Sequence, residues 1–414
     1  MDILVYADWV GLQAPTLMGT LSVTHTRGHG VFMFAYEKTW IDKGIAQQLD
    51  PDLQFFTGPQ YLGDPKNNFG LFLDSSPDRW GRVLMDRREA IMARQERRKP
   101  KKLFEEDYLL GVYDAHRMGA LRFKLEATGR FLNDQSGLAT PPMTSLRELE
   151  QASLRLERND LKETEILKWL NLLLAPGASL GGARPKASVT DEKGQPWIAK
   201  FPSIKDKTDI GAWEMVVNEM ARKAGVQIAG GMLKKYNSEQ HTFLSKRFDR
   251  TTGNRRLHFA SAMTLLGQSD GATGISYLDL AGFITQQGAA ARRDLEELWR
   301  RIVFNILVKN TDDHLRNHGF LLKDKGWELS PAYDVNPVYF GQALTLNISE
   351  TDNSLDIELA KSVARHFRVS SPKANEIIGE VKKAVKGWQK LAAKYHIKKA
   401  EQDLMAGAFE GVES

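Results

Sequence analysis

Residues 310–320 contain the acidic, amide and imidazole side chains best suited to chemistry. Asp312 is followed five residues later by Asn317. This is the spacing of the protein-kinase catalytic loop, where the aspartate accepts the proton of a substrate hydroxyl and the asparagine holds a metal ion. Asp334 takes the place of the second metal-binding aspartate, although the usual Phe-Gly pair does not follow it. We therefore predict Asp312 as the base, Asn317 and Asp334 as Mg²⁺ ligands, and His314 as a hydrogen-bonding organiser of the loop.

A glycine-containing segment, Ser-Leu-Gly-Gly-Ala-Arg-Pro-Lys at residues 179–186, lies between a predicted helix and a predicted strand. The pair Gly181 and Gly182 would let backbone N–H groups approach an anion closely. The segment is not a Walker loop, because the Gly-Lys-Ser/Thr ending is missing, and it does not match the dinucleotide fingerprint. Taken alone, it is explained better by a structural turn than by a phosphate loop.

A lysine and a glutamate in the right order complete the pattern of a nucleotide site. Lys200 lies near the end of a predicted strand, and Glu214 lies fourteen residues later, early in the predicted helix 213–223. Protein kinases use such a strand-to-helix Lys-Glu pair to orient the lysine that contacts phosphates. Glu219 on the same helix is the alternative partner, and we favour Glu214. Together with the glycine turn and the later aspartates, this order predicts a protein-kinase-like phosphotransferase that uses ATP and Mg²⁺.

Two other classes of function stay open at this stage. Asp312, Asp313, His314 and His318 could form the metal cluster of a hydrolase, but that interpretation leaves Lys200 and the glycine turn unexplained. A catalytically silent binding module would keep the fold without turnover. Asp312 on its own would most simply be a capping or turn carboxylate, and the order of the motifs favours the kinase.

The elements that must position these residues change in type along the chain. Short β-branched and aromatic runs near the N-terminus predict a small antiparallel sheet, and a loop at 129–145 with two prolines marks a domain boundary. After about residue 255 the pattern is mostly helical, except for a short hairpin that follows the catalytic loop in the sequence. The predicted elements are strands 4–6, 18–24, 31–36, 187–190, 197–201 and 242–248, helices from 78, over 146–174 and over 212–224, and a core-facing stripe over 377–388.

Composition narrows the class of protein. The 414 residues carry 57 Lys and Arg against 52 Asp and Glu, so the net charge of +5 is weak evidence for direct nucleic-acid binding. A basic cluster at 94–102 is more simply a solvated helix end than a phosphate contact. The absence of cysteine excludes disulfides, thiolate metal sites and Cys nucleophiles. With neither a signal-peptide pattern nor a long apolar run, we expect a cytoplasmic protein without membrane contact.

These motifs resemble those of the HipA family of bacterial toxin-antitoxin serine/threonine kinases over almost the whole chain. Residues 311–317 are similar to the family's catalytic loop and 333–334 to its magnesium aspartate, although Asp313 stands where some members have glycine. The resemblance also identifies an ATP-covering loop, an ATP-lysine strand at 198–202 and a hinge whose backbone would meet adenine. The implied nucleotide-binding residues are Gly181, Gly182, Ala183, Arg184, Lys186, Lys200, Glu214, Lys246, Arg247, Phe248 and His314.

The resemblance implies an α+β fold with a protein-kinase-like two-lobed core, a mostly helical C-terminal lobe and a β-containing N-terminal module. The expected domains are 1–145, 146–250 and 251–414. It also implies a kinase that slows translation by phosphorylating a protein such as an aminoacyl-tRNA synthetase. A HipB-type helix-turn-helix antitoxin would restrain it and would make most of the DNA contact. Autophosphorylation of Ser179 would switch the kinase off.

Overall fold

The computed structural model describes residues 1–26, 29–44, 47–63, 66–135, 140–158, 160, 163–174 and 184–412. The chain divides into two compact units, unit 1 with residues 1–204 and 247–269, and unit 2 with residues 205–246 and 270–414. Ser179, Gly181, Gly182 and Ala183 lie outside the described residues. The expected division into three domains stays a prediction.

Unit 1 begins with a five-stranded sheet, and this confirms the predicted N-terminal antiparallel sheet. Its strand order is β4-β3-β2-β1-β5, and β2 pairs antiparallel with both β1 and β3. Alternate residues of β1, namely Ile3, Val5 and Ala7, are buried, as expected for a strand with one face toward a core. The strands are β1 (Asp2–Ala7), β2 (Thr16–Thr26), β3 (His29–Tyr36), β4 (Gln60–Tyr61) and β5 (Leu121–Lys124).

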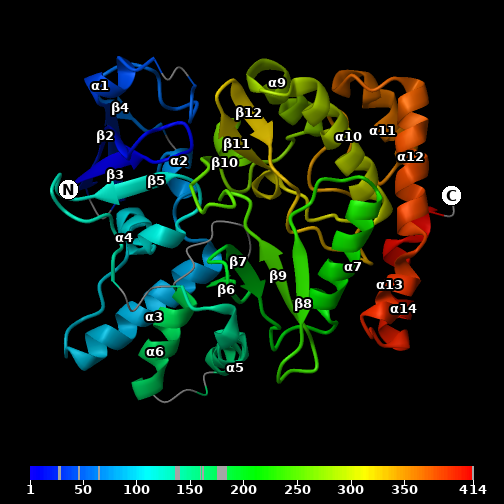
Figure 1. The fold of residues 1–414 in the computed structure, drawn as a ribbon, viewed down its shortest axis with the longest axis horizontal. Coiled ribbons are helices and arrows are strands. Elements are labelled where there is room, and N and C mark those ends of the chain that lie inside the picture. Colours follow the sequence, from blue (N-terminus) through cyan, green and yellow to red (C-terminus); the bar gives the residue numbers. More distant parts are fainter. Residues whose placement is uncertain are drawn as a thin grey trace. The chain divides into compact units, whose positions relative to one another are not determined.

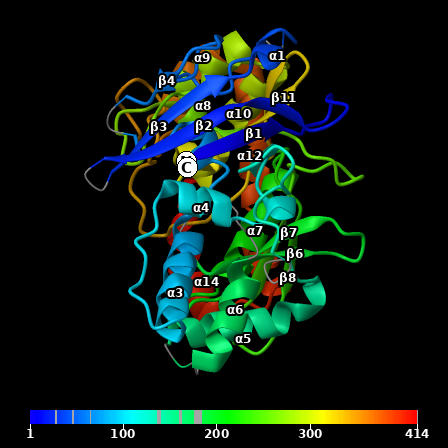
Figure 2. The ribbon, with the colours of Figure 1, turned by 90° about the vertical axis from the view of Figure 1, so that its left-hand side faces the viewer.

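Three helices of unit 1 pack together, with α6 against both α3 and α5 (Figure 2). Asp78 caps α3 because its Oδ1 accepts a hydrogen bond from the backbone N–H of Gly81 at 2.9 Å. The helices of unit 1 are α1 (Lys38–Ile41), α2 (Gly70–Leu73), α3 (Arg79–Gln95), α4 (Glu105–Gly111), α5 (Leu146–Glu157), α6 (Glu163–Leu174) and α8 (Ala262–Leu265).

The prediction of one helix over 146–174 was wrong, because α5 ends at Glu157 and α6 begins at Glu163. The backbone N–H of Asp160 donates to the carbonyl of Arg155, closing a turn after α5. The sequence between the helices contains Asn159 and Asp160, residue types whose side chains compete for backbone hydrogen bonds and favour turns. Apolar residues recur at helical spacing both before and after this turn, so the sequence pattern did not reveal the break between the two helices.

Unit 1 also contains the strands that carry two of the predicted nucleotide-binding lysines. Strand β6 (Lys186–Thr190) pairs antiparallel with β7 (Pro196–Lys200), so that Lys186 lies opposite Lys200 in the register. Both predicted strands are confirmed to within about one residue. The short strand β10 (Phe259–Ser261) completes the unit.

Unit 2 is mostly helical and is built around α10, whose apolar side chains are almost entirely buried. Helix α10 packs against α9 and α12 (Figure 1). The unit has two antiparallel hairpins, β8–β9 and β11–β12. Its elements are α7 (Ile210–Lys223), β8 (Gly231–Lys234), β9 (Thr242–Lys246), α9 (Tyr277–Gln287), α10 (Ala291–Leu307), β11 (Gly319–Lys323), β12 (Gly326–Leu329), α11 (Ile357–Val363), α12 (Ser371–Val385), α13 (Trp388–Lys394) and α14 (Lys399–Met405).

The C-terminal apolar stripe is confirmed as core, but it is shared between two helices. Ile377, Val381 and Val385 are buried on α12, whereas Trp388 begins α13 after a break at Gly387. Across the described residues, we find no helix with the length and apolarity needed to span a membrane.

Candidate functional site

The predicted catalytic loop connects α10 to β11 within unit 2. Helix α10 ends at Leu307, and Lys309 then adopts a left-handed backbone with φ of 47°. A single 3₁₀ turn over Leu315–Asn317 leads into β11 at Gly319. The loop is thus held at one end by a buried helix and at the other by a paired strand, which fixes where its side chains project.

Asp312 and Asp334 belong to the same site. Asp312 is exposed, but partial burial raises the pKa of its carboxyl above the ordinary value. The nearby carboxylates of Asp334 and Asp313 raise this pKa further, against the opposing effect of His314. Asp334 has a left-handed φ of 56°, which is uncommon for a residue with a Cβ atom and is found often at functional sites.

Asn317 has the chemistry of a magnesium ligand. Its Nδ2 donates to the backbone carbonyl of Asp312 at 3.0 Å, and its Oδ1 is buried without a hydrogen-bond partner. Mg²⁺ prefers oxygen ligands and is bound in phosphotransfer sites by one or two protein side chains together with substrate phosphates. The Asn317 and Asp334 oxygens therefore fit this ion. Within the described ranges, no three His, Cys, Asp or Glu side chains gather as a larger metal-binding group.

Asp313 and His318 have each other as partners. His318 Nε2 lies 2.9 Å from Asp313 Oδ2, and both side chains are buried. Burial alone would raise the pKa of Asp313, but the pairing with His318 and a hydrogen bond from Tyr277 lower it below its usual value. The hydrolase interpretation needs both side chains as metal ligands. In the structure they bind each other instead, and Asp313 also binds Tyr277.

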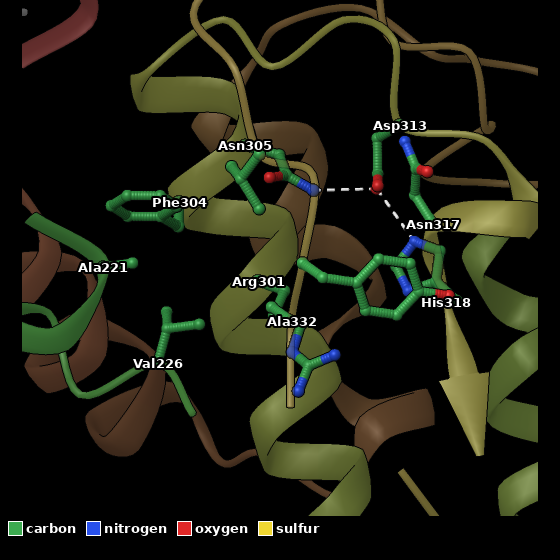
Figure 3. Close-up of a pocket in the computed structure, with 11 residues that line it drawn as sticks. Ala221, Val226, Arg301, Phe304, Asn305, Asp313, Asn317, His318 and Ala332 are labelled. Carbon is green, nitrogen blue, oxygen red and sulfur yellow. Dashed lines mark hydrogen bonds and ion pairs between the residues drawn. The ribbon is translucent and has the colours of Figure 1, made fainter. Parts of the chain in front are cut away.

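A small cavity of about 10 Å³, roughly the room of one water molecule, lies behind the catalytic loop (Figure 3). Asn305, Asp313, Asn317 and His318 are among the side chains that line it. Sequence reasoning missed Asn305 and Tyr277. A lone asparagine in the apolar run at the end of α10 was a usable signal for the first, but no local pattern marks Tyr277.

The lysines of unit 1 differ in their surroundings. Lys186 Nζ lies 2.6 Å from Asp78 Oδ2, and this ion pair is almost fully buried. Lys200 at the end of β7 is also buried, with 7% of its surface exposed. Arg184 is partly exposed. Lys186 therefore has a structural partner of its own, in addition to the role predicted for it beside nucleotide.

Helix α7 in unit 2 carries both glutamates proposed as partners of Lys200. Glu219 Oε1 accepts hydrogen bonds from Lys394, at 2.6 Å, and from the hydroxyl of Tyr395. Burial would raise the pKa of Glu219, but these two partners lower it. Glu214 is more deeply buried, with 4% exposed. Its pairing with Lys200 stays a prediction.

The predicted hinge at 246–250 spans the boundary between the sequence ranges of the two units. The backbone N–H of Lys246 donates to the carbonyl of Gly230, and that of Arg247 donates to Pro196. Phe248 packs near Phe259, with ring centroids 6.0 Å apart. The role predicted for this backbone beside adenine stays a prediction.

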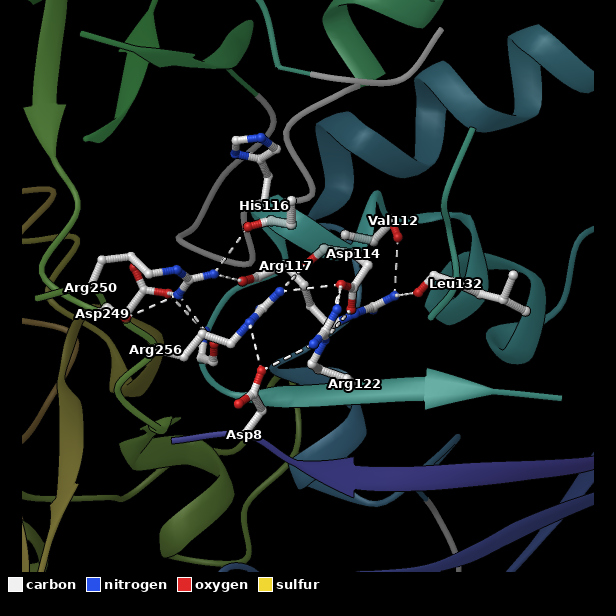
Figure 4. A network of polar contacts seen from close by, with 12 residues as sticks. Asp8, Val112, Asp114, His116, Arg117, Arg122, Leu132, Asp249, Arg250 and Arg256 are labelled. Carbon is white, nitrogen blue, oxygen red and sulfur yellow. Dashed lines mark hydrogen bonds and ion pairs between the residues drawn. The ribbon is translucent and has the colours of Figure 1, made fainter. Parts of the chain in front are cut away.

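Arg247 itself belongs to a buried arginine-aspartate network in unit 1, part of which is drawn in Figure 4. Its guanidinium binds Asp249 and also donates to the carbonyls of His116 and Arg117. Arg250 Nη1 lies 2.6 Å from the same carboxylate, which also accepts the N–H of Gly119 at 2.8 Å. The side chain of Arg247 therefore stabilises unit 1.

A family model described as HipA-like C-terminal domain matches residues 178–388, just over half of the chain. The chain belongs to this family. The match contains the whole set of Lys200, Glu214, Asp312, Asn317 and Asp334. A Haemophilus influenzae protein named "Putative kinase" is 26% identical over 180 residues, which are 38% of this chain and 52% of that protein. The HipA-like chain thus spans about half the length of this curated relative.

One solved structure shows the fold of this HipA-like chain. HipA of the Shewanella oneidensis MR-1 toxin-antitoxin system, solved with HipB and its operator DNA, has a TM-score of 0.65 at 18% identity and covers 99% of this chain and 95% of its own. The proinflammatory kinase CtkA of Helicobacter pylori has a TM-score of 0.43 at 14% identity, over 56% of this chain and 89% of its own. The predicted α+β fold of the HipA type is confirmed.

Proposed function

We propose that this HipA-like chain is an ATP- and magnesium-dependent serine/threonine protein kinase and the toxin of a HipA/HipB-like pair. One observation carries the proposal. Within a HipA-like domain, the exposed Asp312, whose pKa is raised, shares a site with Asp334 and with the unpartnered buried oxygen of Asn317. A base and two oxygen ligands for Mg²⁺ are the protein groups that protein kinases use around the transferred phosphoryl group.

In this proposal Asp312 accepts the proton of the substrate hydroxyl as the phosphoryl group is transferred. Asn317 and Asp334 hold Mg²⁺, which when bound neutralises negative charge on the ATP phosphates. His314 contributes to the nucleotide site by organising the loop. Its electrostatic effect lowers the pKa of Asp312 and so favours the ionised base at neutral pH.

The predicted roles of Lys200, Glu214, the hinge and the glycine loop are part of the same proposal. Lys200 contacts ATP phosphates and is oriented by a glutamate. Glu214 is favoured for this because the carboxylate of Glu219 is already bound by Lys394 and Tyr395. Ser179 is the proposed site of inactivating autophosphorylation, since a phosphate there would place about 1.5 to 2 negative charges beside the loop expected to cover ATP.

The proposed partners follow from family membership and charge. A HipB-type antitoxin is supported by the S. oneidensis complex, and a net charge of +5 agrees with DNA contact made mainly through such a partner. The proposed substrate is a protein, with an aminoacyl-tRNA synthetase as the first candidate. The proposed place of action is the cytoplasm.

The test is incubation of the purified chain with labelled ATP and Mg²⁺, alone and with a panel of bacterial aminoacyl-tRNA synthetases, followed by phosphosite mapping. We expect label on serine or threonine with the parental chain, and none with Asp312→Ala or Lys200→Ala. A parental chain that binds MgATP but labels no protein would indicate a silent binding module. Equal labelling by the parental and Asp312→Ala chains would remove Asp312 from the site.

A further inference from the structure

A buried carboxylate behind the catalytic loop gathers donors from three separate parts of unit 2. Asp313 Oδ2 accepts hydrogen bonds from the Tyr277 hydroxyl, from Asn305 Nδ2 at 2.8 Å and from His318 Nε2 at 2.9 Å. Tyr277 begins α9, Asn305 lies in the last turns of α10, and His318 precedes β11. All four side chains are at least 95% buried. The residue directly after the proposed base is therefore fixed to both neighbouring helices.

The hydrogen bonds continue from this carboxylate to the proposed metal ligand Asp334. Asn305 Oδ1 accepts from Asn310 Nδ2 at 3.1 Å, and Asn310 Oδ1 accepts the backbone N–H of Asn336 at 3.2 Å. Asn336 Nδ2 then donates to Asp334 Oδ1 at 3.2 Å. A chain of hydrogen bonds, which runs through the side-chain amides of Asn305 and Asn310 and through the backbone and side chain of Asn336, thus connects the loop of the base with the loop of the metal ligand.

The chain of amides has only one possible direction. A carboxylate only accepts hydrogen bonds, so Asn305 must present its NH₂ group to Asp313 and its oxygen to Asn310. A backbone N–H only donates, so Asn310 must present its oxygen to Asn336. Each asparagine is therefore fixed at both ends. An asparagine side chain suits these positions because its planar amide carries a donor, the NH₂ group, and an acceptor, the oxygen, on the same carbon.

We propose that Tyr277, Asn305, Asn310 and Asp313 form a positioning network that holds Asp312 and Asp334 at the separation needed for phosphoryl transfer. The network touches neither substrate nor metal and acts through the two loops. Asp334 has a left-handed backbone, which the hydrogen bonds at Asn336 help to maintain. Because a misplacement of about 1 Å can lower a rate by about 100-fold, such support is needed for catalysis in particular. This inference rests on the proposed kinase function.

The variants that test the network are Tyr277→Phe, which removes only the hydroxyl, and Asn305→Leu. Leucine has the same number of side-chain heavy atoms as asparagine but makes none of the three side-chain hydrogen bonds of Asn305, to Tyr277, Asp313 and Asn310. Tyr61→Phe on β4 is the matched control, because Tyr61 is 65% exposed and lies in unit 1. We expect the single-turnover transfer rate to fall about 10- to 100-fold in the network variants, with KM for ATP within about twofold of the parental value. We expect no change in the control.

A second readout does not depend on activity. In the absence of nucleotide, hydrogen exchange of the amides of residues 311–318 should become faster in Tyr277→Phe, while exchange in α12 is unchanged. Exchange at parental rates in this segment would overturn the network, whether or not the chain is a kinase. A fall in transfer rate matched by an equal rise in KM and faster exchange throughout unit 2 would also overturn it, since that result describes general destabilisation. If the parental chain transfers no phosphate, the kinase proposal fails and the exchange measurement alone decides.

Discussion

Asp249 in unit 1 and Asp313 in unit 2 are both buried carboxylates with several donors, and the pKa of each lies below its ordinary value, yet the groups that bind them differ in kind. Asp249 is bound by two guanidinium groups, from Arg247 and Arg250, and its pKa lies well below the ordinary value despite burial. Asp313 is bound by a tyrosine, an asparagine and a histidine. The first carboxylate is neutralised by the protein itself.

The carboxylates around Asp313 are not neutralised to the same degree. Asp312 directly precedes it in the sequence, and the carboxylates of both Asp334 and Asp313 raise the pKa of Asp312. The site also contains the unpartnered Oδ1 of Asn317 and the left-handed backbone of Asp334. These features and the repulsion between carboxylates lower the stability of the folded state, and a bound cation would stabilise it. Direct pairing with two guanidinium groups therefore indicates a structural role for Asp249, whereas carboxylates that raise one another's pKa indicate a site at Asp312.

The largest effect that separates the two regions is expected for Asp312→Asn. Loss of the base should lower the transfer rate by about 10³-fold, near the middle of the range for general-base catalysis. Because the ionised Asp312 is disfavoured by Asp334 and Asp313, its replacement should not lower the free energy of unfolding measured in urea. The exposed Asp324 in the β11–β12 turn offers the matched control Asp324→Asn, which should leave both quantities unchanged. A parental rate in Asp312→Asn would contradict the assignment.

The corresponding variant in unit 1, Asp249→Asn, should lower the stability of the fold and leave the transfer rate nearly unchanged. Asp249→Asn leaves Arg247 and Arg250 buried without their counter-charge, so the free energy of unfolding should fall by about 4 to 5 kcal/mol. Urea denaturation monitored by tryptophan fluorescence measures this. A loss below about 1 kcal/mol would show that the network is not needed for folding and would weaken the comparison.

Lys186 tests whether a residue predicted for nucleotide binding is also structural. Lys186→Met should lower the free energy of unfolding by about 3 to 4 kcal/mol, because Asp78 would remain buried with its charge. Adding Asp78→Asn should recover part of this loss, since the carboxylate charge that Lys186 no longer balances is then removed. If the Lys186→Met chain were as stable as the parental chain but bound ATP more weakly, nucleotide binding and not stability would be the main role of Lys186.

The smallest expected effect is a pH dependence of unit 1 caused by Asp50. Burial raises the pKa of this carboxyl to about 6, although it accepts the backbone N–H groups of Leu71 and Asp52. A folded-state pKa above the unfolded value means that the folded state binds the proton more tightly, so this group's contribution to stability falls as the pH rises from about 4 to about 6.

The variant Asp50→Asn lacks that titration. Its free energy of unfolding relative to the parental chain should therefore rise by about 2 to 3 kcal/mol between pH 4 and pH 6.5, and then stay level. Urea denaturation at a series of pH values measures the difference. A constant difference over this range would show that Asp50 does not titrate as its burial indicates.

Local spacing made part of the site predictable from the sequence. Asp312 and Asn317 lie five residues apart on one turn, so a sequence pattern could identify them, and alternation predicted the strands around Lys186 and Lys200. Tyr277 and Asn305 could not be found in this way, because their contacts with Asp313 depend on how α9 and α10 pack. The structural role of Arg247 was missed for the same reason, since its partners at 116 and 117 lie far away in the sequence.

The assignment of the chemistry to Asp312 is tested most directly by the single-turnover transfer of label from ATP by three chains, parental, Asp312→Asn and Asp249→Asn, at a temperature where all three are folded. We expect Asp312→Asn to lose transfer by about 10³-fold and Asp249→Asn to keep it within about threefold despite its lower stability. Transfer retained by Asp312→Asn but lost by folded Asp249→Asn would contradict the assignment, because the chemistry would then depend on the arginine network in unit 1.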